Sequence, residues 1–262
     1  PLNRAGDAPY WHARRADLQR VLAEAVEARG AAEVRLGERA SPGDLRADLV
    51  VGADGVRSGV RAALLGDAPP RYTGALAWRG IVPLARLDPA EHPPVAAVRV
   101  GAGRHFVSYR VGGAAVNFVG VVRRPDAATE DWEQPGDPAA LAADFAGWPR
   151  AVRSLIDACD APRRWALLDR DPAPRWTDSR TVLLGDAAHP VPPHLAQGAA
   201  LALEDAVVLG RALADAPLRL ALARYEAARR GRASRVLATS RRQGNLLQVG
   251  GPAGALAHAG LR

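Results

Sequence analysis

Two short segments combine residue types suited to holding a nucleotide-like ligand. Asp186 follows the apolar run at residues 181–184, which is typical of a buried strand, and Gly198 opens a long run with helical periodicity. This spacing predicts a carboxylate at the carboxyl end of a strand with a helix N-terminus beside it, where α/β proteins bind nucleotides and cofactors. The carboxylate suits a ribose hydroxyl, and the backbone N–H groups of Gly198, Ala199 and Ala200 suit an anionic or electron-rich group. An ordinary strand–loop–helix with a capping aspartate explains the same spacing equally well.

Asp54 has a similar position. It follows the apolar run at residues 49–52, typical of a buried parallel strand, and precedes Ser58, which we expect to cap a helix that continues to about Leu65. Asp54 and Asp186 would then both lie at carboxyl ends of strands. Because Asp-Gly after a strand is also common in turns, Asp54 alone does not identify a ligand.

The strand pattern at residues 104–109 carries two side chains that can transfer protons. Period two places His105, Val107 and Tyr109 on one face. His105 and Tyr109 would lie about 13 Å apart along the strand, so they could flank one ring-sized ligand but could not share a short hydrogen bond. Histidine titrates near neutral pH and is the natural proton acceptor. Packing of both side chains against a neighbouring sheet is the alternative.

The segment that contains Asp186, GDAAHPVPPHLAQGAALALEDA, resembles the flavin-contacting GD motif of the single-component, FAD-dependent aromatic hydroxylases. The salicylate hydroxylase and 6-hydroxynicotinate 3-monooxygenase branch is the most similar. Other segments match in the family's order. They are residues 14–18 (its RADL helix), 48–61 (its DG motif), 78–80 and 104–109 (its substrate-domain strands) and 164–172 (the segment before the GD strand).

The resemblance implies an α/β (α+β) fold: a doubly wound FAD/NAD(P)-binding sheet with an inserted β-rich substrate domain. Residues 1–70 and 163–230 would form the FAD-binding domain, residues 71–162 the substrate domain, and residues 231–262 a C-terminal tail. The implied activity is an FAD-dependent monooxygenase. It would use NADH or NADPH and O₂ to hydroxylate a small phenolic or hydroxypyridine-type substrate through a flavin C4a-hydroperoxide.

The resemblance also implies roles for individual residues. His105 and Tyr109 would act on the substrate as the catalytic pair, and His194 and Trp78 would lie in the substrate pocket. The residues implied to contact FAD are Arg15, Leu36, Asp54, Asp186, Pro193, Gly198, Ala199 and Ala200.

One expected segment is missing from the pattern. The family begins with a strand, a GxGxxG loop and a helix that hold the ADP half of FAD, and nothing in this chain matches them. We therefore expect the chain to be the C-terminal two-thirds or so of such an enzyme. Two alternatives stay open: a related flavoprotein such as an epoxidase, halogenase or biosynthetic hydroxylase, and a truncated remnant that does not retain FAD.

Composition argues against several other classes of protein. All 35 basic residues are arginine, and they are scattered among 28 acidic residues without a sustained basic run, so the net charge of +7 does not indicate nucleic-acid binding. The lone Cys159 gives neither a disulfide framework nor a metal cluster. No apolar run is long enough to cross a membrane. We expect a cytoplasmic monomer or homodimer with no bound metal.

Periodicity and turn residues predict the remaining elements. The sequence predicts a helix over 13–29 with Gly30 as its C-cap, and a hairpin from residues 33–36 and 44–49. It further predicts strands over 75–83, 95–100, 105–111, 115–122 and 163–169, helices over 138–145, 149–159 and 218–230, and a loop over 126–138.

Overall fold

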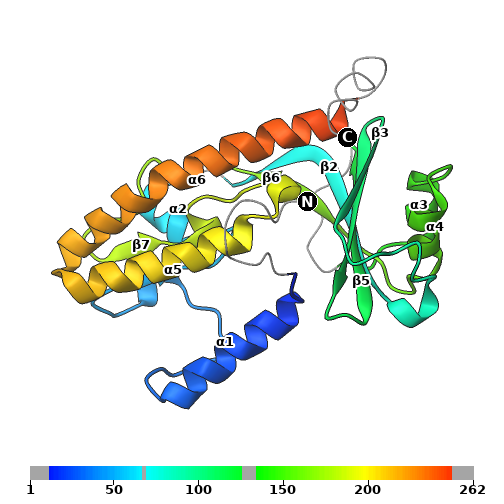
Figure 1. Cartoon of the computed structure of the whole chain (residues 1–262). Coiled ribbons are helices and arrows are strands. Elements are labelled where there is room, and N and C mark those ends of the chain that lie inside the picture. The colour runs from blue at the N-terminus through cyan, green and yellow to red at the C-terminus, as the bar shows by residue number, and fades with distance from the viewer. Residues whose placement is uncertain (1–11, 67–68, 126–133, 250–262) are drawn as a thin grey trace. The chain divides into compact units, whose positions relative to one another are not determined.

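The computed structural model describes residues 12–66, 69–125 and 134–249, which divide into two compact units (Figure 1). The first unit contains the described residues within Pro1–Glu38, Leu76–Arg123 and Glu130–Trp165. The second contains those within Arg39–Ala75, Arg124–Thr129 and Ala166–Arg262. In these described ranges, no helix has both the length and the apolar character needed to cross a bilayer.

The structure contains a five-stranded sheet with strand order β3-β4-β5-β2-β6, and strands β3, β4 and β5 lie wholly in the first unit. Strands β3, β4 and β5 are antiparallel neighbours, and their register sets His105 opposite Val121 and Tyr109 opposite Asn117. All the strands predicted between residues 75 and 122 are confirmed, and so is the one predicted over 163–169. Their bounds are β2 (Arg71–Pro83), β3 (Ala97–Gly101), β4 (Arg104–Val111), β5 (Ala115–Arg123) and β6 (Arg163–Asp169).

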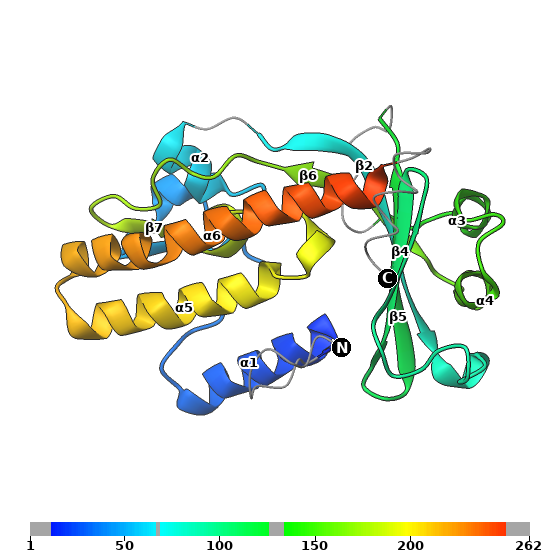
Figure 2. The same cartoon turned by 45° about the horizontal axis from the view of Figure 1, so that its top comes forward.

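Two short helices cover one face of this sheet, α3 (Pro138–Asp144) and α4 (Arg150–Asp157) (Figure 2). Both were predicted from the sequence. Phe106 of β4 packs edge-on against Phe145 with ring centroids 5.2 Å apart, and Trp78 Nε1 donates to Asp144 Oδ2 at 2.8 Å. Because side chains alternate along a strand, the odd-numbered residues of β4, His105 among them, project from the other face.

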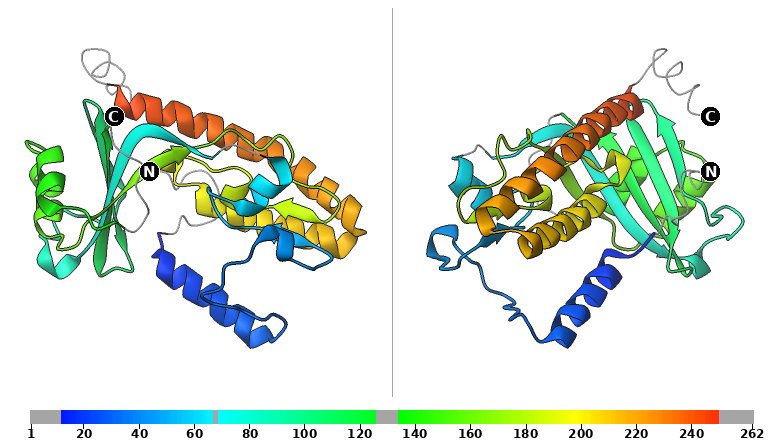
Figure 3. Two further views of the ribbon diagram at one scale, coloured as in Figure 1. Left: turned by 180° about the vertical axis from the view of Figure 1, so that it is seen from behind. Right: turned by 60° about the vertical axis from the view of Figure 1, so that its left-hand side comes forward.

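The second unit contains the parallel pair β1 (Val50–Gly52) and β7 (Thr181–Leu183). Helix α2 (Gly59–Leu65) follows β1, and the long helices α5 (Gly198–Asp215) and α6 (Leu218–Gln248) run side by side, as both views of Figure 3 show. The buried Tyr225 of α6 donates to the Leu183 carbonyl of β7 at 3.0 Å and so attaches α6 to the strand.

The predicted hairpin is wrong. Residues 33–36 form no strand, and residues 42–44 form a single 3₁₀ turn, Pro42–Asp44. Val34 and Leu36 are 58% and 87% exposed, so the described residues offer no apolar surface on which a two-stranded ribbon could be stable. Helix α1 (Arg15–Arg29) is confirmed, and it ends at Gly30 in the left-handed conformation as predicted.

Helix α6 is longer than the prediction of 218–230, since it continues to Gln248. Its second half packs on the proline-rich loop before α5: Ser240 Oγ donates to the Pro192 carbonyl at 2.7 Å. Long-range contacts of this kind are invisible to helical periodicity. Residues 126–133 of the predicted loop and residues 250–262 of the predicted tail lie outside the described residues.

Candidate functional site

The structure brings Asp186 to the N-terminus of α5. The exposed Asp186 carboxylate lies close to Gly198, because a Cβ built on Gly198 would be 3.9 Å from Asp186 Oδ1. The N-cap residue Gln197 makes no side-chain cap, and the first turn of α5 carries no acidic residue. A carboxylate acceptor therefore adjoins a helix end whose positive dipole receives no side-chain cap.

Backbone geometry forms this loop at two positions. Gly185 has φ 59°, and a Cβ there would lie 3.1 Å from Ala202 Cβ, so the position favours glycine twice over. Ala196 has φ 52°, the one positive φ at a non-glycine among the described residues. A left-handed alanine costs roughly 1–2 kcal/mol, and it turns the chain directly before Gln197. Sequence reasoning missed Ala196, because alanine carries no signal for this conformation.

A buried carboxylate, Asp205, binds the first part of the loop and helix α6. Asp205 Oδ2 accepts from the Gly185 backbone N–H at 3.0 Å and lies 2.5 Å from His189 Nε2. Arg229 Nε of α6 donates to Asp205 Oδ1 at 2.6 Å. Burial raises the pKa of the Asp205 carboxyl, but the bonds from His189 and Arg229 outweigh it and hold that pKa below its usual value. These contacts give His189 a structural position.

Asp54 caps a helix in the second unit. Its Oδ1 accepts from Ser58 Oγ at 2.5 Å, and its Oδ2 accepts from the Gly59 N–H at 2.8 Å. Ser58 Oγ in turn accepts from the Arg61 N–H at 2.8 Å, which confirms the predicted cap of α2. Both carboxylate oxygens of Asp54 therefore serve the turn between β1 and α2.

Arg61 connects the DG and GD segments, and the sequence reasoning did not identify it. Its side chain is 2% exposed and donates to the Ala188 carbonyl at 3.2 Å and to the Asp171 carbonyl at 2.9 Å. A planar guanidinium with several donors suits this bridging of backbone carbonyls. The only signal in the sequence is the spacing of arginines in DGVRSGVR.

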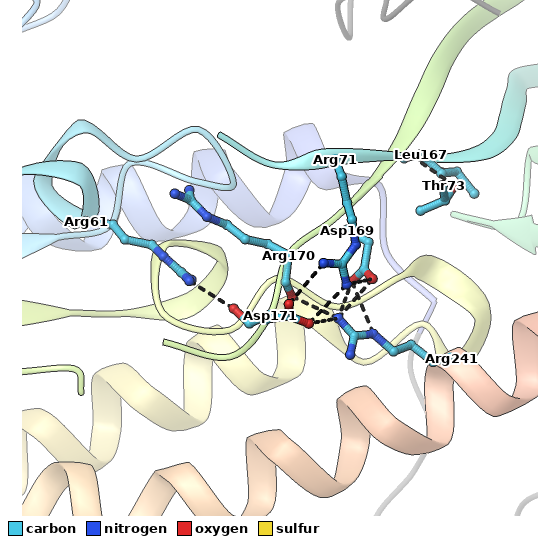
Figure 4. Close-up of polar contacts among 8 residues, drawn as sticks. All are labelled: Arg61, Arg71, Thr73, Leu167, Asp169, Arg170, Asp171 and Arg241. Carbon is cyan, nitrogen blue, oxygen red and sulfur yellow. Dashed lines mark hydrogen bonds and ion pairs between the residues drawn. The ribbon is translucent and has the colours of Figure 1, made fainter. Parts of the chain in front are cut away.

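An arginine–aspartate cluster adjoins this bridge (Figure 4). Arg71 of β2 pairs with Asp171 and Asp169 at 3.0 and 3.2 Å, and Arg241 of α6 bonds the same two carboxylates. The hydrogen bond from Arg71 holds the pKa of Asp171 at about 2. The cluster joins the ends of β2 and β6 to α6 and supports the segment that leads into the GD strand.

His194 and Pro193 lie on the loop before α5. The His194 ring packs against α6, where a Cβ built on Gly244 would be 2.4 Å from Nε2. Burial lowers the pKa of the His194 imidazole. Pro193 is exposed. Asp54, Asp186, Pro193, His194 and the first turn of α5 all belong to the second unit, whereas Arg15 and the exposed Leu36 belong to the first unit.

His105 and Tyr109 share one face of β4, as predicted. His105 is 3% exposed, and the half-buried Tyr109 stacks with His12 at a centroid distance of 4.5 Å. Trp78 is fully buried on the opposite face, against α3, so the structure does not bring it together with the pair. Arg79, the next residue of β2, therefore projects from the face that carries His105 and Tyr109. Its Cζ lies 5.1 Å from the centre of the Trp165 ring.

The donor set of the second unit fits FAD. Asp186 offers an exposed acceptor for a ribityl or ribose hydroxyl, and the N–H groups of Gly198 to Ala200 offer donors to an electron-rich flavin edge. A separate pocket of about 500 Å³ opens beside α2, with Arg57, Ser58 and Arg170 in its lining. Asp186 and Gly198 do not line it, so its volume alone does not mark the cofactor site.

Comparison with known proteins agrees with this geometry. The 3-amino-4-hydroxybenzoate 2-monooxygenase PtmB3 of Streptomyces platensis is 40% identical over 91% of this chain and 64% of its own. The 6-hydroxynicotinate 3-monooxygenase of Pseudomonas fluorescens is 41% identical over 72% of this chain and 51% of its own. A solved salicylate hydroxylase–substrate complex is 30% identical with a TM-score of 0.74, covering 94% of this chain and 70% of that one.

These similarities confirm the predicted resemblance and fold class. The chain spans 64% of the length of the Streptomyces platensis relative. The family model described as "FAD binding domain" matches residues 12–240. The chain belongs to the FAD binding domain family.

Proposed function

We propose that the full-length protein is an FAD-dependent monooxygenase that uses NAD(P)H and O₂ to hydroxylate a small phenolic or hydroxypyridine-type aromatic. The observation that carries this proposal is the Asp186 carboxylate beside the N-terminus of α5, in a chain of the FAD binding domain family. The relatives add support, since their names specify 3-amino-4-hydroxybenzoate and 6-hydroxynicotinate as substrates. Dependence on NAD(P)H is consistent with a cytoplasmic enzyme.

Residues of the second unit would hold the cofactor. Asp186 would accept a hydroxyl of FAD, and the backbone N–H groups of Gly198, Ala199 and Ala200 would stabilise negative charge on the flavin ring. When bound, FAD supplies the transfer of electrons from NAD(P)H to O₂. Asp205 and Arg61 would position the loop without touching the cofactor, because both are buried among protein groups.

Residues of β4 would handle the substrate. A ring that carries O⁻ is richer in electrons than one that carries OH, and therefore reacts faster with an electrophilic oxygen. An imidazole nitrogen of His105 would accept the phenolic proton, which leaves the substrate as a phenolate and the imidazole as its cation. Its burial supports this role by keeping bulk water from competing for the proton. Tyr109 would contact the far end of the same ring.

The test is substrate-stimulated oxidation of NAD(P)H by the full-length protein loaded with FAD. A panel of hydroxybenzoates and hydroxypyridine acids is supplied with ¹⁸O₂, and the product is analysed by mass spectrometry. The proposal predicts that at least one member accelerates NAD(P)H oxidation and gains one ¹⁸O atom. If none does either, the protein is not an aromatic hydroxylase of this kind.

A further inference from the structure

Arg79 is a half-buried cation that pairs with no described carboxylate, on the sheet face that carries His105 and Tyr109. Its neighbour Trp78 bonds Asp144 of α3, so period two directs Arg79 to the opposite face of the sheet. The Arg79 side chain is half-buried, and its buried Nε donates to no acceptor within the described part of the chain. None of the described carboxylates forms an ion pair with it. Such a group requires an explanation, since buried donors are normally bonded.

Burying the charged guanidinium of Arg79 without a carboxylate partner costs free energy. Burial lowers the pKa of its guanidinium below the usual value, yet arginine stays charged at physiological pH. The ring of Trp165 lies 5.1 Å from Cζ and offsets part of this cost by a cation–π contact. An aromatic face does not satisfy the in-plane N–H donors, which favour a carboxylate or phosphate that can accept two parallel bonds.

A second unsatisfied donor lies on the same face. Asn117 is 6% exposed, and its Nδ2 also has no hydrogen-bond partner among the described residues. Asn117 pairs with Tyr109 in the register of β4 and β5, so their side chains share a face. Arg79 lies on β2 and Asn117 on the neighbouring strand β5. The residues that follow them also meet, on the other face, since a Cβ built on Gly80 would lie 2.4 Å from the Phe118 ring.

We propose that Arg79 selects substrates that carry a carboxylate, with the Asn117 amide as a second donor to the same anionic group or to the ring substituent beside it. This inference rests on the proposed function and refines it, because it names the ionic class of the aromatic substrate. Arg79 acts as a specificity-determining residue. It contacts the carboxylate, while His105 on the same face takes the phenolic proton.

The test compares acids with their neutral amides. Dissociation constants are measured by calorimetry on the full-length, FAD-loaded protein without NAD(P)H, so that no turnover occurs. The ligand pairs are 3-hydroxybenzoate with 3-hydroxybenzamide, and 6-hydroxynicotinate with 6-hydroxynicotinamide. The variants are Arg79→Gln, which removes the charge, and Arg79→Lys, which keeps the charge but cannot donate two parallel hydrogen bonds to one carboxylate. Arg99→Gln is the matched control, since Arg99 bonds Ser108 on the face of α3 and α4.

We expect the unaltered protein and R99Q to bind the acid of at least one pair roughly 10- to 100-fold more tightly than its amide. R79Q should bind acid and amide within about threefold of each other, and R79K should lie between. R79Q should also melt no lower than the unaltered protein, since a buried unpaired charge is removed; a large loss of stability would give Arg79 a packing role instead.

Three results would overturn the inference: an acid preference that survives in R79Q, equal binding of acid and amide by the unaltered protein, or no binding of any of the four ligands. Hydroxylation separates this failure from failure of the proposed function. If a neutral phenol or amide is hydroxylated as well as the acids, the monooxygenase assignment stands and the role of Arg79 falls.

Discussion

The imidazole of His189 and the carboxylate of Asp205 form a buried pair, with 2.5 Å between Nε2 and Oδ2, at 2% and 0% residue exposure. The same carboxylate holds the Gly185 backbone and Arg229 of α6. One side chain thus holds Gly185 and His189, which lie on either side of Asp186 in the sequence, and connects them to α6. The contribution of Asp205 to the free energy of unfolding can be measured.

Asp205→Ala should reduce the free energy of unfolding by about 3–5 kcal/mol, because it leaves the guanidinium of Arg229 buried with fewer partners. Chemical denaturation measures this value. Glu204→Ala is the matched control. The Glu204 side chain is 35% exposed and also pairs with Arg229, and its loss should cost about 1 kcal/mol or less. Equal effects of the two substitutions would contradict a special role for Asp205.

Two helix glycines give a second comparison. A Cβ on Gly244 would meet His194 at 2.4 Å, whereas a Cβ on Gly210 of α5 would meet nothing within 4 Å. Gly244→Ala should destabilise the protein by about 1–3 kcal/mol through displacement of the loop. Gly210→Ala should stabilise it by about 0.5–1 kcal/mol through helix propensity. Thermal melts of the two variants measure these opposite changes. A G244A variant that is more stable than the unaltered protein would show that α6 does not hold His194.

The cluster of Figure 4 predicts a titration. Arg71→Gln should raise the pKa of Asp171 from about 2 toward the ordinary aspartate value of about 3.9. Since the pKa is lower in the folded state than in the unfolded one, this pair stabilises the fold above pH 4 or so, and its contribution is lost as the pH falls toward 2. Carboxyl-carbon NMR titration of the two proteins checks the shift. An unchanged Asp171 pKa in R71Q would contradict the pairing.

The proton-acceptor role of His105 predicts a change in pH dependence. In the full-length, FAD-loaded protein, His105→Gln should lower kcat about 10²–10⁴-fold near neutral pH, with a smaller change in KM. Its rate should then rise toward pH 10, where the phenol of the substrate ionises unaided. His92→Gln is the control, because His92 lies 3.2 Å from Ser154 Oγ of α4. If H105Q keeps the pH profile of the unaltered enzyme, His105 does not move the proton.

Local sequence patterns predicted what depends on neighbours along the chain. The spacing of Asp186 and Gly198 placed a carboxylate at a helix N-terminus, and Ser58 and Gly30 marked helix ends, because turns and caps involve residues a few positions apart. The network of Asp205, Arg229 and Arg61 was not predictable, since its bonds join residues separated by 20 to more than 100 positions.

Other errors have physical causes of the same kind. The prediction of a hairpin was wrong because alternating apolar residues over 33–36 are not sufficient. A two-stranded ribbon is stable only when its apolar face packs against other elements. The end of α6 was missed because Gly231 follows Arg230, and glycine is unfavourable inside a helix. The second half of α6 is held by contacts of Ser240 with Pro192 and of Gly244 with His194. Trp78 was expected in the substrate pocket but lies on the face of its strand that α3 covers. Sequence alone does not tell which face α3 and α4 cover.

The most direct test of the account is the absorbance spectrum of the full-length protein, incubated with FAD and desalted, beside that of Asp186→Ala and Asp54→Ala. The account predicts retained flavin bands in the unaltered protein and loss of most bound flavin in D186A without loss of stability, because Asp186 is exposed. D54A should keep FAD but unfold more easily by about 1 kcal/mol, because it loses the cap of α2. A protein that retains no flavin, or a D186A variant that retains as much as the unaltered one, would contradict the assignment of this loop as the flavin site.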